Sequence, residues 1–292
     1  MKALWAYEPF HQDKARIKGL HQLLKQLVTQ PSHIEVGFIV TRTEPSLNLA
    51  FDVPYQERFS LYPHKLVKQS LQKAGVRIDD KKIHVVDHQT FSNSNAVAQL
   101  LKLAKARNKD LIALYTQSRH GLQRLTLGSF AETAIHQSRI NLLLLNPGAA
   151  LSPKMKAVFY MTDLAPASKK HFKQVVSICK QLQTRLTVFH AAEVIYQWSL
   201  EQHDPQVRAY RRKVASMQAW MEQECRRASI PCDVIIHSAM RPVTEMALKF
   251  AKQSKADLIV VAAKSSAMAA LMGGSITRQI VRASKKPVLV LK

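Results

Sequence analysis

The chain contains few cysteines, few glycines and no long apolar run, and each of these scarcities argues against a particular class of protein or binding site. Its 3 cysteines among 292 residues, Cys179, Cys225 and Cys232, are odd in number and lack the C-x-x-C spacing. This pattern argues against a disulfide framework or a zinc site and favours reduced structural thiols. No apolar run approaches the roughly 20 residues that span a membrane, and the opening residues hold no continuous apolar stretch of a secretory signal. We therefore expect a cytoplasmic protein without a membrane partner.

Acidic residues are also scarce, with 20 Asp and Glu against 43 Lys and Arg, for a formal net charge of +23. Residues 1–150 hold 20 basic and 11 acidic side chains (+9), which leaves 23 and 9 (+14) for residues 151–292. A positive field in both halves favours an anionic partner, such as nucleic acid or a nucleotide. The alternative is that these lysines only solvate helix faces, because neither an RNP-like aromatic pattern nor a helix-turn-helix is recognisable.

What the sequence does contain is a regular alternation of short apolar runs and amphipathic runs of helical period. Several short runs are apolar almost throughout, which is typical of parallel strands that helices cover on both faces. The predicted strands are 3–7, 33–41, 82–87, 110–116, 140–146, 156–161, 186–192, 232–238, 257–263 and 287–292, and the predicted helices are 15–28, 58–75, 95–107, a run from 129, 166–183, 206–228, 242–254 and 275–284.

The order of these elements repeats, and it predicts two α/β domains, residues 1–148 and 153–292, joined by a linker rich in proline and glycine. We expect each to be a flavodoxin-like doubly wound domain, with a five-stranded, mainly parallel sheet flanked by helices. A proline within the predicted helix 58–75, Pro63, is expected in its first turn.

Two Gly-Ser pairs mark the repeat most closely. Gly128-Ser129 and Gly274-Ser275 each follow an Asp-Leu-Ile strand, each open a helix-length run, and each precede an apolar last strand. This order resembles the universal stress protein family, in tandem. The resemblance implies an adenine nucleotide alpha hydrolase-like fold and a role in survival under stress.

In nucleotide-binding members, the resemblance implies a phosphate loop G-x2-G-x9-G-(S/T), in which glycines let backbone N–H groups approach the phosphates. It also implies an acidic residue after the first strand. In the first half, Tyr115 and Ser118 replace the two leading glycines, Gly128 and Ser129 remain, and the acid is Glu8. A tyrosine ring where backbone must approach phosphate predicts that the first site is closed or rebuilt.

The second half departs less from the family pattern. Its loop is one residue shorter, Ala262 stands for the first glycine, and Ser265 or Lys264 stands for the second. The whole chain has 8 glycines, which fits a general loss of glycine turns. The candidate nucleotide-binding residues of this half are Asp163, Ala191, Ala262, Ser265, Gly274, Ser275 and Ile276.

Several of these residues also have structural explanations. Ser129 with Glu132 fits a capping box, and Asp163 could cap a helix entry near Ala165 and Ser168. His190 on an apolar strand predicts a core histidine with one satisfied nitrogen.

His84 and His88, four residues apart, could suggest a metal site. They lack a recognisable third ligand, so we interpret them as ordinary histidines.

The sequence therefore predicts a stress-response protein that acts by binding and is not an enzyme, with degenerate nucleotide sites and no cofactor. One alternative is adenine-nucleotide binding in the second half, with slow ATP hydrolysis. A further alternative is nucleic-acid binding through the basic surface. The resemblance implies pairing edge to edge through the last strands, and exposed apolar edge strands are hazardous. We therefore predict that Leu142–Leu145 and Val288–Leu291 face each other in an intrachain pseudo-dimer, and two chains could pair again.

Overall fold

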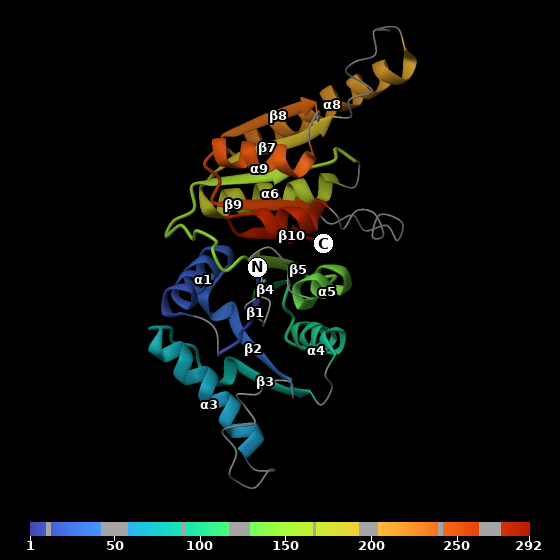
Figure 1. Cartoon of the computed structure of the whole chain (residues 1–292). Helices are drawn as coiled ribbons and strands as arrows, with labels where there is room; N and C mark the ends of the chain where they lie inside the picture. Colours follow the sequence, from blue (N-terminus) through green and yellow to red (C-terminus); the bar gives the residue numbers. More distant parts are fainter. Residues whose placement is uncertain are drawn as a thin grey trace. The chain divides into compact units, whose positions relative to one another are not determined.

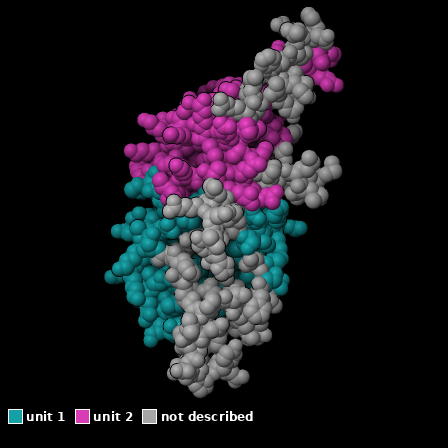
Figure 2. All heavy atoms as spheres, viewed as in Figure 1, with its two compact units in different colours: residues 1–147, 151–153 teal, residues 148–150, 154–292 magenta. Residues whose placement is uncertain are grey.

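A computed structural model describes residues 1–9, 13–41, 58–88, 92–116, 129–165, 168–192, 204–238, 242–262 and 276–292. The chain divides into two compact units, shown in different colours in Figure 2. Unit 1 is Met1–Pro147 with Leu151–Pro153, and unit 2 is Gly148–Ala150 with Lys154–Lys292.

Unit 1 is a parallel sheet in the strand order β3-β2-β1-β4-β5, with helices in the connections (Figure 1). This order confirms the predicted doubly wound α/β class, because each crossover returns the chain in the same direction. Its elements are β1 (Ala3–Ala6), α1 (Lys14–Leu27), η1 (Pro31–His33), β2 (Ile34–Thr41), α3 (Arg58–Lys73), η2 (Asp80–Lys82), β3 (Ile83–His88), α4 (Asn93–Ala106), β4 (Leu111–Tyr115), α5 (Ser129–Gln137) and β5 (Asn141–Leu145).

Unit 2 repeats this arrangement, with the strand order β8-β7-β6-β9-β10. Each of its five strands occupies the same place in this order as its counterpart in unit 1, so the sequence repeat is a repeat of fold. Its elements are β6 (Ala157–Met161), α6 (Ser168–Leu182), β7 (Arg185–Ala192), α8 (Pro205–Arg227), β8 (Cys232–Ser238), α9 (Val243–Gln253), β9 (Leu258–Ala262), a helix over residues 276–283 and β10 (Val288–Leu291).

The central strands are covered on both faces, as their unbroken apolar sequences predict. Every side chain of β6, from Ala157 to Met161, is buried. On α6, Phe172 is fully buried, and its ring centroid lies 6.1 Å from that of Tyr160 and 5.4 Å from that of Trp220. Truncation of such a side chain typically costs about 3 to 5 kcal/mol of stability, so this aromatic layer fixes α6 on the sheet.

The shortage of glycine is visible where helices end. Asn108, Gln183, Ser229 and Lys255 follow α4, α6, α8 and α9 and have φ between 50° and 57°, the left-handed region that glycine normally occupies. Each is followed by a backbone hydrogen bond back to the helix, such as Ala256 N–H to the Ala251 carbonyl at 2.9 Å. These helices therefore end in Schellman motifs in which the left-handed residue is not glycine.

The position of Pro63 corrects one prediction. Helix α3 begins at Arg58, so Pro63 lies inside the helix, in its second turn, and the predicted first-turn location is wrong. A proline there lacks the N–H that would bond one turn back, and the helix continues through Lys73 without that hydrogen bond.

Candidate functional site

The strand order defines where each unit can hold a ligand. In both units the chain direction of the crossovers changes between the first and fourth strands, and ligands of doubly wound sheets bind at the carboxyl ends of those strands. Register pairs Trp5 with Ala113 in unit 1 and Met161 with Val261 in unit 2. We call these ends the switch-point edge of each unit. In unit 2, Asp163 follows β6 by two residues and Ala262 is the last residue of β9, so both belong to this edge.

Asp163 holds the turn that leads from β6 into α6. Its Oδ1 accepts a hydrogen bond from the backbone N–H of Ala165 at 3.0 Å and another from the Ser168 hydroxyl at 3.4 Å. Between them, Leu164 has φ 53° and donates its N–H to the Thr162 hydroxyl at 3.1 Å. The carboxylate thus makes the helix-entry contacts that the sequence offered as one explanation, while its side chain is exposed to solvent.

The other predicted residues of unit 2 are spread along the same edge. Ala191 is paired with His237 in the β7–β8 ladder, and Ala262 is paired with Leu291 and partly exposed. Ile276, at the start of the helix over 276–283, is 41% exposed. Three further predicted residues lie outside the described part of the chain, namely Ser265, Gly274 and Ser275.

Two residues that the sequence analysis missed, His171 and Lys292, also lie at this edge. The His171 ring is hydrogen-bonded to the backbone of Lys292, and Asp163 is close enough to act on its charge. Burial, with a contribution from Lys170, lowers the pKa of His171, and burial lowers the pKa of Lys292 to about 8. The family pattern contains neither position, and the folded chain brings α6 and the end of β10 together.

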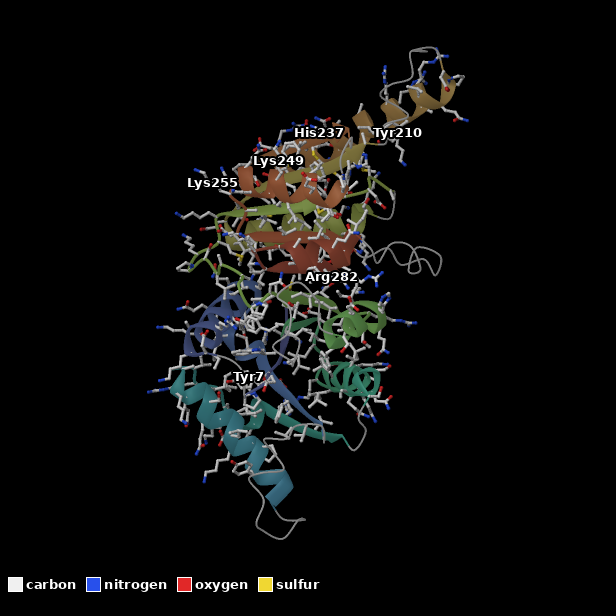
Figure 3. The ribbon with its side chains drawn as sticks, in the orientation of Figure 1. Tyr7, Tyr210, His237, Lys249, Lys255 and Arg282 are labelled. Carbon is white, nitrogen blue, oxygen red and sulfur yellow. The ribbon has the colours of Figure 1, made fainter. Side chains whose placement is uncertain are left out.

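His190 is buried between β6 and α8, and both of its ring nitrogens are satisfied. Nδ1 donates to the Thr162 carbonyl at 3.0 Å, so Nε2 accepts from the Tyr210 hydroxyl at 3.0 Å. The sequence analysis expected one satisfied nitrogen. Beside this chain of hydrogen bonds, a cavity of about 450 Å³ lies between α8 and the ends of β7 and β8 (Figure 3 labels Tyr210). It is lined by Ala192, Tyr210, Arg211, Val214, Ala215, Gln218 and Ile236.

The switch-point edge of unit 1 is filled by aromatic side chains. Tyr115 ends β4 and donates its hydroxyl to the Arg16 carbonyl of α1 at 3.0 Å, and burial raises its pKa. After β1, Tyr7 is 3% exposed, and its hydroxyl pairs with the Ser70 hydroxyl at 2.7 Å. Tyr115 therefore extends from β4 to α1 across the space beside the switch point.

The Gly-Ser pair of unit 1 is described in part. Ser129 is the first residue of α5, with Glu132 in the first turn, and its carbonyl accepts the Thr133 hydroxyl at 2.7 Å. Gly128 and Ser118 lie outside the described residues.

At the opposite, amino-terminal ends of the strands, unit 1 buries a charged cluster around Glu35. Its carboxylate bonds to His84 Nε2 at 2.6 Å, Arg107 Nε at 2.9 Å and Lys109 Nζ at 2.8 Å. Burial alone would raise the pKa of Glu35, but these three hydrogen bonds outweigh it and lower the pKa to about 2. His84 is thus part of an ion cluster. Among the described residues, no group of His, Cys, Asp and Glu is arranged to hold a metal ion.

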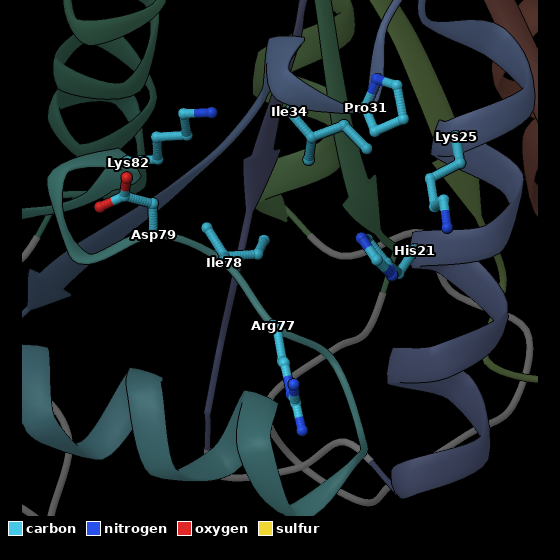
Figure 4. Close-up of a pocket in the computed structure, with 8 residues that line it drawn as sticks. All are labelled: His21, Lys25, Pro31, Ile34, Arg77, Ile78, Asp79 and Lys82. Atoms are coloured by element: carbon cyan, nitrogen blue, oxygen red, sulfur yellow. The ribbon is translucent and has the colours of Figure 1, made fainter.

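A second cavity, of about 190 Å³, lies at these amino-terminal ends (Figure 4). Small-molecule sites typically measure about 300 to 1,000 Å³, so it is too small for a nucleotide. Its lining comes from α1, the start of β2 and the segment before β3, and comprises His21, Lys25, Pro31, Ile34, Arg77, Ile78, Asp79 and Lys82. In the described part of the chain, no helix has the length and apolarity to cross a bilayer.

Two parallel α/β units of one strand order, each with a switch-point edge, define a tandem protein of the doubly wound α/β class. The model of the universal stress protein family matches residues 18–146 and 155–292, and the chain belongs to this family. No curated protein sequence matches the chain significantly.

Solved structures share this fold. A universal stress protein from Archaeoglobus fulgidus DSM 4304 is 18% identical, with a TM-score of 0.68 over 100% of this chain and 98% of that one. A universal-stress-type protein from Pseudomonas aeruginosa UCBPP-PA14 is 12% identical, with a TM-score of 0.60 over 100% and 93%. A universal stress protein from Archaeoglobus fulgidus in complex with dAMP is 13% identical, with a TM-score of 0.35 over 47% and 98%.

Proposed function

We propose that this chain is a cytoplasmic stress-response protein that acts by binding and not by catalysis, with the nucleotide site of its first unit closed. The observation that carries the proposal is Tyr115, whose ring and hydroxyl connect β4 to the Arg16 carbonyl where a phosphate-binding backbone would have to approach its ligand. The three free cysteines support a reducing compartment.

An adenine nucleotide at the switch-point edge of unit 2 is the second candidate. There the fourth strand ends in Ala262, so a methyl group stands where Tyr115 of unit 1 has its phenol ring. Asp163 offers a carboxylate to ribose hydroxyls. Lys292 supplies positive charge and hydrogen-bond donors for phosphate, and the His171 ring lies beside its backbone. The Archaeoglobus fulgidus protein that matches 47% of this chain is described in complex with dAMP.

Calorimetric titration of the full chain with ATP and with dAMP tests both statements. Binding at unit 2 predicts at most one nucleotide per chain, and Asp163→Asn should weaken it about tenfold, because a hydrogen bond to a charged group is lost. The asparagine can still accept the Ala165 N–H through its amide oxygen. The matched control in unit 1, Glu8→Gln, should change nothing.

Two outcomes would contradict the proposal. Two nucleotides bound per chain would show that Tyr115 does not close the first site. Release of phosphate from ATP at a rate that depends on the protein, and is lost in Asp163→Asn, would show that the chain is an enzyme.

Nucleic-acid binding is a third candidate, and the amino-terminal half of α8 favours it. Arg208, Arg211, Arg212 and Lys213 are all exposed, and no acidic residue occurs between Pro205 and Met221. A helix of 23 residues is about 34 Å long, whereas the neighbouring β8 spans about 23 Å, so α8 extends beyond the strand ends (Figure 1). Like charges three and four residues apart destabilise a helix, so this cluster has a cost that an anionic partner would offset.

Filter binding of a single-stranded oligonucleotide at two salt concentrations tests this candidate. Four phosphate contacts with a single strand predict that affinity falls about 50-fold between about 50 and 200 mM salt. Arg211→Gln with Arg212→Gln should reduce the steepness of log affinity against log salt by about 1.4. The control is Arg226→Gln with Arg227→Gln at the other end of α8, where Glu222 and Glu224 already pair with these arginines. An unchanged slope in the first variant would remove α8 as the binding surface.

A further inference from the structure

The cavity of about 450 Å³ in unit 2 has the size of a small-molecule site and is separate from the switch-point edge. Its strand residues belong to β7 and β8, whereas the switch-point edge belongs to β6 and β9, further along the order β8-β7-β6-β9-β10. Successive residues of a strand face opposite sides of the sheet. Ile236 accordingly lines the cavity, while the ring centroid of His237 lies 5.2 Å from that of Phe250 on α9. The cavity is therefore bounded by α8 and by the face of the sheet opposite α9.

The cavity lies where the apolar stripe of α8 is incompletely covered. Val207, Val214 and Met221 are seven residues apart in turn, so they share one face of the helix. Val207 and Met221 are buried, and so is Met217, but Val214 is partly exposed. Ile236, which lines the same cavity from β8, is partly exposed as well. The described side chains thus leave an apolar space beside Val214 that a ligand can fill.

The lining carries a single charge, which is positive. Arg211 is exposed and always protonated, and the other residues of the lining are uncharged types. No acidic residue lies on α8 within one turn of Arg211 on either side. Tyr210 adds a hydroxyl whose position is fixed by the ring of His190, with 3.0 Å between the phenol oxygen and Nε2. The cavity thus combines apolar walls with one cation and one oriented hydroxyl.

This combination discriminates between classes of ligand. A polyphosphate needs several charged donors, and the lining has one. A nucleotide would place the ring nitrogens of its base against apolar side chains, where they would lose their hydrogen bonds to water. An uncharged apolar molecule would gain nothing from Arg211. A carboxylate on an apolar body matches both parts of the lining, because a guanidinium binds a carboxylate through two parallel hydrogen bonds.

We propose that this cavity binds a small amphipathic carboxylate. The apolar body of the ligand lies against Ala192, Val214 and Ile236, and its carboxylate pairs with the guanidinium of Arg211. The site lies on unit 2 but does not depend on the nucleotide site proposed for the same unit, so the chain can hold ligands of two classes.

Calorimetric titration of the full chain with octanoate, and with octanol as its uncharged match, tests the proposal. About one octanoate should bind per chain, and more tightly than octanol. Arg211→Gln should weaken octanoate about tenfold, because a hydrogen bond to a charged group is lost, and should leave octanol unchanged. The matched control is Arg212→Gln, an exposed neighbour outside the lining, which should change neither affinity.

Two further variants fill the space from α8. Val214→Phe adds a ring at the partly exposed position, and Ala215→Phe adds one at an exposed position of the lining. Each should lower the affinity for octanoate and for octanol at least tenfold, because the apolar body no longer fits. Circular dichroism and thermal unfolding check that both variants fold. If Val214→Phe does not fold, Ala215→Phe decides the result, because an exposed substitution leaves the packing of α8 on the sheet intact.

Four results would overturn the proposal. The first is a titration in which octanoate gives no heat beyond that of dilution. The second is octanoate binding that survives in the folded filling variants. The third is an equal loss in Arg211→Gln and Arg212→Gln, which would indicate a general attraction to the basic surface of α8. The fourth is displacement of octanoate by an equal concentration of AMP. The nucleotide site of unit 2 is tested separately by Asp163→Asn, so failure of one site leaves the other unaffected.

Discussion

At the scale of single residues, we expect the carboxylate of Glu35 to make a large contribution to the stability of unit 1. Lys109, whose side chain is 4% exposed, depends on this carboxylate for its charge partner. Removal of one partner from a buried ion cluster leaves an uncompensated charge, so Glu35→Gln should lower the free energy of unfolding by about 3 kcal/mol, measured by urea denaturation at pH 7. The matched control is Asp80→Asn. Its partner is the exposed Lys68 at 2.6 Å, and its loss should cost less than about 1 kcal/mol.

The same cluster predicts a pH dependence. The pKa of Glu35 is about 2 in the folded chain and 4.5 as the reference value, so the unfolded chain takes up the proton first as pH falls. The stabilisation is therefore complete above the reference pKa and is lost as pH falls from about 4.5 to 2. The stability difference between the wild type and Glu35→Gln should shrink over that range. A difference that stays constant from pH 7 to pH 3 would mean that the charge of Glu35 is not what stabilises the cluster.

At the scale of elements, the helix ends carry a cost that a substitution can remove. Lys255 is exposed and follows α9 at φ 52°, where a side chain costs roughly 1 to 2 kcal/mol. Part of that gain is offset by the greater freedom of glycine in the unfolded chain, so Lys255→Gly should raise the free energy of unfolding by about 0.5 to 1 kcal/mol. In Lys252→Gly, at the penultimate residue of α9, the sign should reverse, with a loss of up to about 1 kcal/mol. If both variants lose stability, the left-handed conformation of Lys255 is not a source of strain.

Several features of the helices and strands could be predicted from the sequence. The strand from Ala157 to Met161 was predictable because parallel strands are apolar throughout, and the order of elements was predictable because the two halves repeat it. Asp163 was named because the family resemblance implies an acidic residue after the first strand, and its helix-entry contacts with Ala165 and Ser168 were considered in advance. The strand and the order of elements depend on local sequence, which periodicity and spacing report directly.

Contacts between distant elements left no such signal. His171 reaches the backbone of Lys292 because the fold brings α6 to the end of β10. His190 bonds to Tyr210 because the fold brings α8 to the end of β7, a contact that no spacing in the sequence indicates. Such pairs are fixed by the packing of helices on the sheet, and the sequence offers each member as an isolated residue.

At the scale of the whole molecule, the terminal strands β5 and β10 raise the question of what covers them. Each ends the strand order of its own unit, and a parallel edge strand leaves alternate backbone N–H groups without a partner in that unit. We propose that Leu142–Leu145 and Val288–Leu291 pair within one chain as a pseudo-dimer. The alternative is that each strand pairs with a second copy of the chain.

Hydrogen exchange, followed by NMR or mass spectrometry over a range of protein concentrations, separates these arrangements. Pairing within the chain predicts slow exchange at every backbone N–H of both strands, unchanged on dilution. Pairing between chains predicts protection that falls as the protein is diluted, together with a change in sedimentation. The opposite terminal strand of unit 2, β8, is the control, because its side chains are partly exposed and its outward N–H groups should exchange quickly. If the outward amides of β5 or β10 exchange as quickly as those of β8, the strand is an open edge and the pseudo-dimer does not form.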